Sequence, residues 1–107
     1  MPEYIIRFDP DALDEWDALD GSIRKLFEKF LTKLVINPFI LGRRLNKDLD
    51  GCFKIKLRSQ GYRIIYEVIE NIITIYIWAV GKREDNAIYT TASQRIAHQR
   101  QIEASEP

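Results

Sequence analysis

Hydrophobic and polar positions in the first 20 residues predict a strand followed by a helix. Residues 4–8 (YIIRF) have the β-branched and aromatic composition of a short strand. Asp9 can cap the next helix, which has Pro10 at its first position. Apolar side chains then recur every three residues, at Leu13, Trp16 and Leu19. We therefore expect a short amphipathic helix over residues 10–19, with an acidic outer face.

A longer helix is predicted from Ile23 onward. Its apolar positions have the spacing of a single helix face: Ile23, Leu26, Phe27, Phe30, Leu31, Leu34 and Val35. Asn37-Pro38 ends this helix, because the residue before a proline is disfavoured in the α conformation. The stripe could form a groove for a partner helix, but we expect it to pack in the core. The opposite face is basic and contains Arg24, Lys25, Lys29 and Lys33.

Three strands and one more helix are predicted in the remainder of the chain. A loop at 38–51 contains a short strand near 43–45, and strands follow at about 52–57, 62–69 and 72–80. The segments between these strands are short enough for antiparallel hairpins. A last helix over about 88–103 has Tyr89, Ala92 and Ile96 on one side, and its end merges into a polar tail at about 97–107.

This order of elements predicts an α+β fold, in which a small antiparallel sheet packs on an N-terminal helical hairpin and a C-terminal helix follows. A chain of 107 residues is expected to form one domain, spanning 1–107. The single cysteine excludes an internal disulfide framework and is typical of a reducing cytoplasm. No apolar run approaches the ~20 residues of a membrane span, and the N-terminus lacks the features of a signal peptide. We therefore expect a cytoplasmic protein with no membrane partner.

The charges are unevenly distributed, although 16 basic and 16 acidic residues give a net charge of zero. Residues 1–20 contain seven acids and one base, a net charge of −6. Residues 21–66 contain three acids and eleven bases, a net charge of +8, and residues 67–107 contain six acids and four bases, a net charge of −2. Nucleic-acid-binding domains usually have a pI above about 9. The basic middle of the chain nevertheless suits an anionic partner.

The segment at 52–58 (CFKIKLR) is the most informative part of the sequence. Alternate residues of a strand face opposite sides, so the apolar residues point inward and Lys54, Lys56 and Arg58 share the other face. Such a row repels itself and adds no stability to a strand. Protection of a sheet edge by lysine is the alternative role, but this segment has a hairpin partner.

The position of Arg63 depends on the register of that hairpin. A four-residue loop with Gly61 in the left-handed conformation pairs Lys56 with Arg63, so that Lys54, Lys56 and Arg63 converge on one face. A three-residue loop turns Arg63 to the opposite face. We predict the four-residue loop.

Two lysines and an arginine at one place form an oxyanion site suited to phosphate. Crowded cations also lower one another's pKa, so that one lysine can act as a general base. Arg83 could stabilise a leaving or non-bridging oxygen, and Tyr89 could stack on a base.

Other nuclease chemistries lack the necessary residues. The only histidine, His98, cannot provide a two-histidine acid–base pair, and it is expected to be an exposed helix residue. The acidic pairs at 48/50 and 84/85 are expected in loops and do not form a two-metal site. Cys52 begins a buried strand and is expected to be an inert core thiol. We therefore predict neither a metal nor a cofactor.

Three motifs in combination resemble the RelE family of toxins, from the RelE/ParE superfamily of type II toxin–antitoxin systems. They are CFKIKLRSQGYRIIYEV, IYIWAVGKREDNAIY and the N-terminal FDPDALDEWDAL. The resemblance covers about 85 residues and implies a small sheet with two N-terminal helices and a C-terminal helix. It also implies a ribosome-dependent mRNA interferase, in which the 2′-hydroxyl attacks the adjacent phosphate of the A-site codon without a metal.

The resemblance further implies the roles of five residues. Lys56 corresponds to the general base, and Lys54 and Arg63 to transition-state stabilisers. Arg83 corresponds to the general acid or leaving-group stabiliser, and Tyr89 to the residue that stacks on the codon. The other basic residues are expected to contact RNA or the ribosome: Arg24, Lys25, Lys29, Lys33, Arg43, Arg44, Lys47, Arg58 and Lys82.

Partners also follow from the resemblance. They are a cognate RelB-like antitoxin, the 70S ribosome and A-site mRNA, and the toxin–antitoxin complex is expected to bind operator DNA through the antitoxin. Two alternatives remain open: a non-catalytic gyrase inhibitor or ribosome-binding module of the ParE kind, and an interaction protein whose basic strand is only a solvated face. The five filled positions favour the enzyme.

Overall fold

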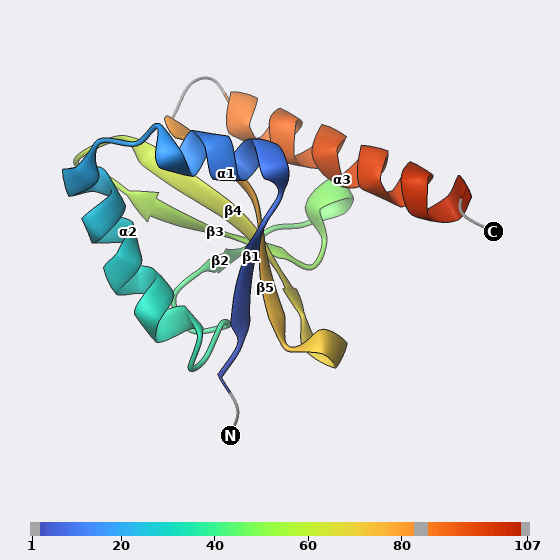
Figure 1. Cartoon of the computed structure of the whole chain (residues 1–107), viewed down its shortest axis with the longest axis horizontal. Coiled ribbons are helices and arrows are strands. Elements are labelled where there is room, and N and C mark those ends of the chain that lie inside the picture. The colour runs from blue at the N-terminus through green and yellow to red at the C-terminus, as the bar shows by residue number, and fades with distance from the viewer. Residues whose placement is uncertain (1–2, 83–85, 106–107) are drawn as a thin grey trace.

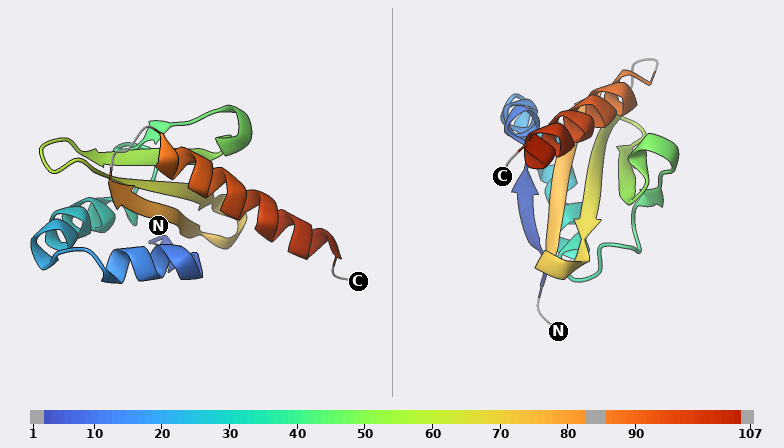
Figure 2. Two further views of the ribbon diagram at one scale, coloured as in Figure 1. Left: turned by 90° about the horizontal axis from the view of Figure 1, so that it is seen from above. Right: turned by 90° about the vertical axis from the view of Figure 1, so that its right-hand side faces the viewer.

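A computed structural model describes residues 3–82 and 86–105 and shows a five-stranded sheet with helices on both faces (Figures 1 and 2). The strand order is β1-β5-β4-β3-β2. The elements are β1 (Ile5–Phe8), α1 (Pro10–Asp17), α2 (Gly21–Leu34), β2 (Arg43–Arg44), η1 (Lys47–Leu49), β3 (Cys52–Leu57), β4 (Tyr62–Ile69), η2 (Glu70–Ile72), β5 (Thr74–Lys82) and α3 (Ala87–Ser105). The predicted α+β class is confirmed. No helix in the described ranges is long and apolar enough to cross a membrane.

The sheet is mixed rather than wholly antiparallel. The pairs β2–β3, β3–β4 and β4–β5 are antiparallel, as their short connections predict, but β1 runs parallel to β5. No hairpin joins β1 to β5: two helices and three strands separate them along the chain. A parallel pair requires such a long crossover connection. The short connections that predict antiparallel hairpins therefore give no indication that β1 pairs with β5.

Several element boundaries differ from the predicted ones. The second helix begins at Gly21 rather than at Ile23. The Asp20 side chain accepts the Ser22 N–H at 3.2 Å and so caps α2. Strand β5 begins at Thr74 rather than at residue 72, because η2 and Ile73, with a left-handed φ of 50°, precede it. The predicted polar tail is helical through Ser105, and α3 projects beyond the sheet with residues 97–105 exposed (Figure 1).

The larger core lies between the sheet and helices α1 and α2. The predicted apolar stripe of α2 faces it, and Phe27 and Leu34 are fully buried. Asp9 caps α1 as predicted, because its side chain accepts the N–H groups of Asp11 and Ala12 at 3.0 and 3.2 Å. The stripe of α2 is therefore used for packing and is not left open for a partner helix.

A second, smaller core lies under α3 on the other face of the sheet. Ile88, Ala92 and Ile96 of α3 pack there against the face that carries Ile65 and Trp78. Trp78 is the additional residue of a β-bulge, because Ile65 lies opposite residue 79 while residue 66 lies opposite residue 77. This smaller face is the one on which Lys54, Lys56 and Arg63 are placed.

The loop after α2 holds β2 beside β3. The buried Tyr66 hydroxyl donates to the carbonyl oxygen of Pro38 at 3.0 Å, and the Tyr66 ring stacks on Phe53 with 5.5 Å between the centroids. A Cβ atom at Gly42 would overlap the Tyr66 hydroxyl, so only glycine allows this close approach. The loop thereby brings Arg43 opposite Lys54.

Candidate active site

The β3–β4 hairpin has the predicted register. Leu57 lies opposite Tyr62 and Lys56 opposite Arg63, so the loop contains four residues. Gly61 has a left-handed φ of 74°, and its N–H donates to the Leu57 carbonyl oxygen at 2.8 Å. Paired residues share a face, so the predicted convergence of Lys54, Lys56 and Arg63 is confirmed.

Tyr89, from the first turn of α3, joins two of these cations. Its hydroxyl oxygen accepts hydrogen bonds from Arg63 Nη1 at 2.7 Å and from Lys54 Nζ at 3.1 Å. The ring also faces both groups, with its centroid 5.3 Å from Lys54 Nζ and 5.5 Å from the Arg63 guanidinium carbon. Arg63 is buried, with 9% of its surface exposed. One hydroxyl oxygen thus lies between two positively charged side chains.

Lys56 is the cation whose protonation is most affected by this arrangement. The positive charge of Lys54 is the largest cause that holds the pKa of Lys56 below its ordinary value. Partial desolvation and the charges of Arg63 and Arg43 lower its pKa in the same direction. A neutral Lys56 amine is therefore accessible at lower pH than for an isolated lysine, and this is the property that a general base requires.

The cluster formed by Lys54, Lys56, Arg63 and Tyr89 has no carboxylate partner in the described part of the chain. The two ion pairs found among residues 3–82 and 86–105 both belong to Arg95. Cations that are close together and lack counter-ions attract an anion strongly. Phosphate oxygens suit both the planar guanidinium and the ammonium groups of the cluster.

Three of the other predicted basic residues lie near this cluster. Arg43 and Arg58 line a groove beside β3 together with Lys54 and Lys56. Lys47 lines a second groove, between η1 and α3, to which Tyr89 also contributes. These three residues extend the positive surface around the cluster.

The remaining predicted contacts lie elsewhere. On the opposite side of the sheet, α2 presents Arg24, Lys25, Lys29 and Lys33. Arg24 donates to the carbonyl oxygens of Asp17 and Leu19, both at 3.3 Å, and so stabilises the end of α1. Arg44 and Lys82 lie over the rings of Phe53 and Tyr62, which belong to that same face. Arg83 lies outside the described residues.

Two other predictions about single residues are confirmed. Cys52 is buried, and desolvation is the largest cause that raises the pKa of its thiol to about 12, so it is an unreactive core thiol. His98 is exposed on α3. The shared hydroxyl contact of Tyr89 was not predicted, because it joins residues 26 and 35 positions apart and leaves no local pattern in the sequence.

Comparisons with known proteins agree with this fold and these motifs. The model of the family described as "ParE toxin of type II toxin-antitoxin system" matches residues 6–87. A putative RelE-like toxin protein of Escherichia coli is 43% identical over 93 residues, which are 87% of this chain and 97% of that protein. The mRNA interferase toxin RelE of Escherichia coli K12 is 39% identical with the same coverage.

Solved structures show the same relationship. A mutant of Escherichia coli toxin RelE in the free state superposes with a TM-score of 0.78 at 37% identity and covers 88% of this chain and 98% of its own. RelE in the intact Escherichia coli RelBE complex superposes with a TM-score of 0.66 at 38% identity and covers 76% of this chain and 98% of its own. Fold and sequence together define a toxin of the type II toxin–antitoxin class. The chain belongs to the RelE family within the RelE/ParE superfamily.

Proposed function

We propose that this chain, an mRNA interferase by its family, cuts mRNA in the ribosomal A site by attack of a 2′-hydroxyl on the adjacent phosphate. The observation that supports this reaction most directly is the convergence of Lys54, Lys56 and Arg63 beneath Tyr89. The cluster combines a lysine of lowered pKa with two cations that can hold a phosphate.

In the proposed reaction Lys56 acts as the general base. Its neutral amine takes the 2′-hydroxyl proton as the 2′-oxygen forms a bond to phosphorus, and the bond from phosphorus to the 5′-oxygen breaks. The products are a 2′,3′-cyclic phosphate and a 5′-hydroxyl. We assign to Arg83 the role of leaving-group stabiliser, because a guanidinium stays protonated in proteins, and the 5′-oxygen takes up a proton from water as it leaves.

Lys54 and Arg63 are proposed to bind the non-bridging oxygens of the scissile phosphate. The Tyr89 hydroxyl oxygen now accepts hydrogen bonds from both groups, at 3.1 and 2.7 Å. A phosphate oxygen is a better acceptor because it is charged. RNA binding therefore replaces the hydroxyl, and the released Tyr89 ring can stack on a codon base.

The other basic residues are proposed to bind the ribosome from two sides of the sheet. Arg43, Lys47 and Arg58 surround the cluster and suit the mRNA and the RNA beside it. The α2 residues, with Arg44 and Lys82, suit a separate segment of ribosomal RNA. Contacts with phosphate of this kind give affinity without sequence selection.

The partners are proposed from the relatives. RelBE toxin–antitoxin complexes are solved from Escherichia coli and Mycobacterium tuberculosis. We propose a RelB-like antitoxin for this chain as well, with operator DNA bound through the antitoxin. The toxin is proposed to act in the cytoplasm as a single domain over 1–107, without a membrane partner.

Primer extension on a reporter mRNA after induction of the chain tests the reaction. We expect cleavage at A-site codons by the native chain, and loss of a general base lowers such rates by about 10²–10⁴-fold. Lys56→Ala and Lys56→Arg should both lose cleavage, because arginine keeps the charge but does not release a proton. Arg100→Ala, at an exposed position of α3, is the control and should cleave normally.

Two outcomes contradict the proposal. Full cleavage by Lys56→Arg would show that Lys56 supplies charge and not a base. Intact mRNA together with inhibition of gyrase supercoiling would instead identify a toxin of the ParE kind.

A further inference from the structure

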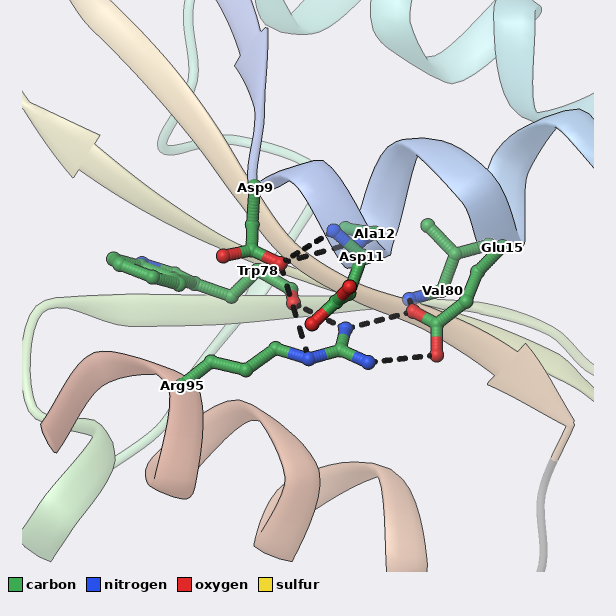
Figure 3. A network of polar contacts seen from close by, with 7 residues as sticks. All are labelled: Asp9, Asp11, Ala12, Glu15, Trp78, Val80 and Arg95. Atoms are coloured by element: carbon green, nitrogen blue, oxygen red, sulfur yellow. Dashed lines mark hydrogen bonds and ion pairs between the residues drawn. The ribbon is translucent and has the colours of Figure 1, made fainter. Parts of the chain in front are cut away.

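Beyond the end of β1, side chains form hydrogen bonds with the backbone at the edge of β5. Phe8, the last residue of β1, lies opposite Ile77, so among the described strands none covers this side of β5 beyond that point. The Val80 N–H instead donates to Glu15 Oε1 at 3.1 Å, and the Trp78 carbonyl oxygen accepts from Arg95 Nη1 at 2.9 Å (Figure 3). Glu15 and Arg95 therefore satisfy backbone groups that a neighbouring strand would otherwise pair.

Arg95 connects three elements at this point. Its Nη1 and Nη2 donate to the two carboxylate oxygens of Glu15 at 2.8 and 3.0 Å, and its Nε lies 3.8 Å from Asp9 Oδ2. Figure 3 shows the guanidinium of α3 placed between α1 and β5, with the dashed contacts directed to both. The side chains of Arg95 and Asp9 are only 17% and 15% exposed. A bidentate, charge-assisted pair in such surroundings has a strict geometry.

The apolar contacts of α3 do not provide the same precision. Ile88, Ala92 and Ile96 are its buried residues, and one of these three is an alanine. Apolar burial is non-directional, so it restricts the rotation of the helix and its position along its axis less strictly than hydrogen bonds do. The hydrogen bonds of Arg95 to Glu15 and Trp78 are directional and fix both. Glu15 departs from the predicted acidic outer face of α1, because it is turned to α3 and β5, whereas Asp11, Asp14 and Asp17 are exposed.

Tyr89 lies on the same helix, six residues before Arg95. Six residues of an α-helix span about 9 Å, so any rotation or shift of α3 is transmitted to the tyrosine. In the free protein the Tyr89 hydroxyl makes bonds of 2.7 and 3.1 Å to Arg63 and Lys54. A displacement of α3 would move the ring away from this place, where it is proposed to stack on the codon once a phosphate has replaced the hydroxyl.

We propose that Arg95, held by Glu15 and Asp9, is a positioning residue that places Tyr89 over the Lys54–Arg63 cluster and thereby sets the rate of mRNA cleavage without contacting RNA. This inference rests on the proposed function. It assigns a role to the contacts of Arg95 with Glu15 and Asp9, which join α3 to the segment that forms α1.

Single-turnover cleavage on ribosomes programmed with mRNA tests this role. The variants are Arg95→Lys, which keeps the charge but loses the bidentate geometry, and Glu15→Gln. We expect the cleavage rate constant at saturating toxin to fall by about 10- to 100-fold, the scale expected when a reacting group is displaced by about 1 Å. The toxin concentration for half-saturation should not change, because no ribosome contact is removed. Gln99→Ala, an exposed change on α3, is the control.

A double-mutant cycle with Tyr89→Ala separates positioning of Tyr89 from a general loss of structure. In a Tyr89→Ala background, Arg95→Lys should cause no further loss of rate, because the group that it positions is absent. Additive losses, a cleavage rate unchanged by Arg95→Lys, or an effect confined to half-saturation would each overturn the proposal. So would normal cleavage by Tyr89→Ala alone. Variants are compared at a temperature where circular dichroism shows each of them to be folded.

A structural measurement distinguishes failure of this inference from failure of the proposed function. If the native chain cuts no mRNA, the proposed function fails. The positioning of Tyr89 is then judged by NMR of the free protein, in which Arg95→Lys should shift the Tyr89 ring resonances and speed exchange of the Val80 amide. Unchanged Tyr89 resonances would overturn the inference whatever the enzymatic result.

Discussion

Replacing Arg63 by methionine should make the protein more stable while removing its activity. Arg63 is a buried cation whose side chain bonds only to the Tyr89 hydroxyl within the described residues, and its neighbours Lys54 and Lys56 carry the same charge. Its partner on β5 is Gly81, which presents no side chain. Methionine has a similar length and no charge to bury.

The magnitude follows from the shared hydroxyl oxygen. Because Arg63 Nη1 and Lys54 Nζ lie 2.7 and 3.1 Å from the same atom, they are no more than about 6 Å apart. Two positive charges at about 6 Å repel by roughly 0.7 kcal/mol in water and by about 3 kcal/mol at an effective dielectric constant of 20. Arg63→Met relieves that repulsion and the cost of burying a guanidinium.

The opposing loss is one hydrogen bond to a charged group, about 1.5–3 kcal/mol. Tyr89 keeps Lys54 as a donor, so no buried acceptor is left unpaired. We expect a net stabilisation of about 1 kcal/mol, which raises the Tm of a domain of this size by roughly 4 °C.

Arg95→Met is the matched comparison, because Arg95 is a partly buried arginine that does have carboxylate partners. Its removal leaves Asp9 and Glu15 without their cation. Breaking a buried pair costs about 3–5 kcal/mol, and we expect about 2 kcal/mol because the Glu15 side chain is 34% exposed. Urea unfolding followed by circular dichroism measures both variants.

The two arginines should therefore change the free energy of unfolding in opposite directions. If Arg63→Met destabilised the chain by 1 kcal/mol or more, the description of the cluster as uncompensated positive charge would be wrong. Arg63→Lys keeps the charge and should fall between the native chain and Arg63→Met.

Two further predictions concern groups of altered pKa. The pH–rate profile of cleavage should rise with pH as Lys56 loses its proton. Lys54→Met should move this rise to higher pH, because it removes the largest cause that lowers the pKa of Lys56. A rise that stays at the same pH in Lys54→Met would argue against Lys56 as the base. Cys52, whose thiol pKa burial raises to about 12, should not react with a thiol reagent at pH 8 until denaturant is added, and rapid labelling of the folded chain would contradict its burial.

The sequence was sufficient to predict those features of the structure that depend on residues close together in the chain. Alternation of apolar and charged side chains located β3, the short connection after it indicated β4 as its hairpin partner, and a glycine able to adopt a positive φ at position 61 favoured a four-residue loop. The register followed from that loop, and with it the meeting of Lys56 and Arg63. The three cations of the sheet could therefore be placed together from local rules alone.

Contacts between distant segments were not predictable in this way. The parallel pairing of β1 with β5 and the bond of Arg95 to Glu15, 80 positions apart, have no periodic signature. The acidic side of α1 was typical of a solvated face, and nothing local indicates that Glu15 turns toward α3. Even a correct list of elements leaves such contacts undetermined, because the packing of the helices on the sheet creates them.

The structure also explains how a chain without net charge can present a strongly positive site. Four of the described acids make contacts within the fold: Asp9 and Glu15 bind Arg95, Asp20 caps α2, and Glu67 accepts from the Trp78 indole N–H at 3.0 Å. Each of these four acids therefore has a donor of its own, and none of them forms an ion pair with Lys54, Lys56 or Arg63. Salt screens exposed charges beyond about 10 Å at 0.1 M ionic strength, so a phosphate at the site responds to its immediate neighbours and not to the total charge. Because the described residues provide the cluster with no carboxylate partner, its positive charge is left available to RNA even though the chain as a whole has no net charge.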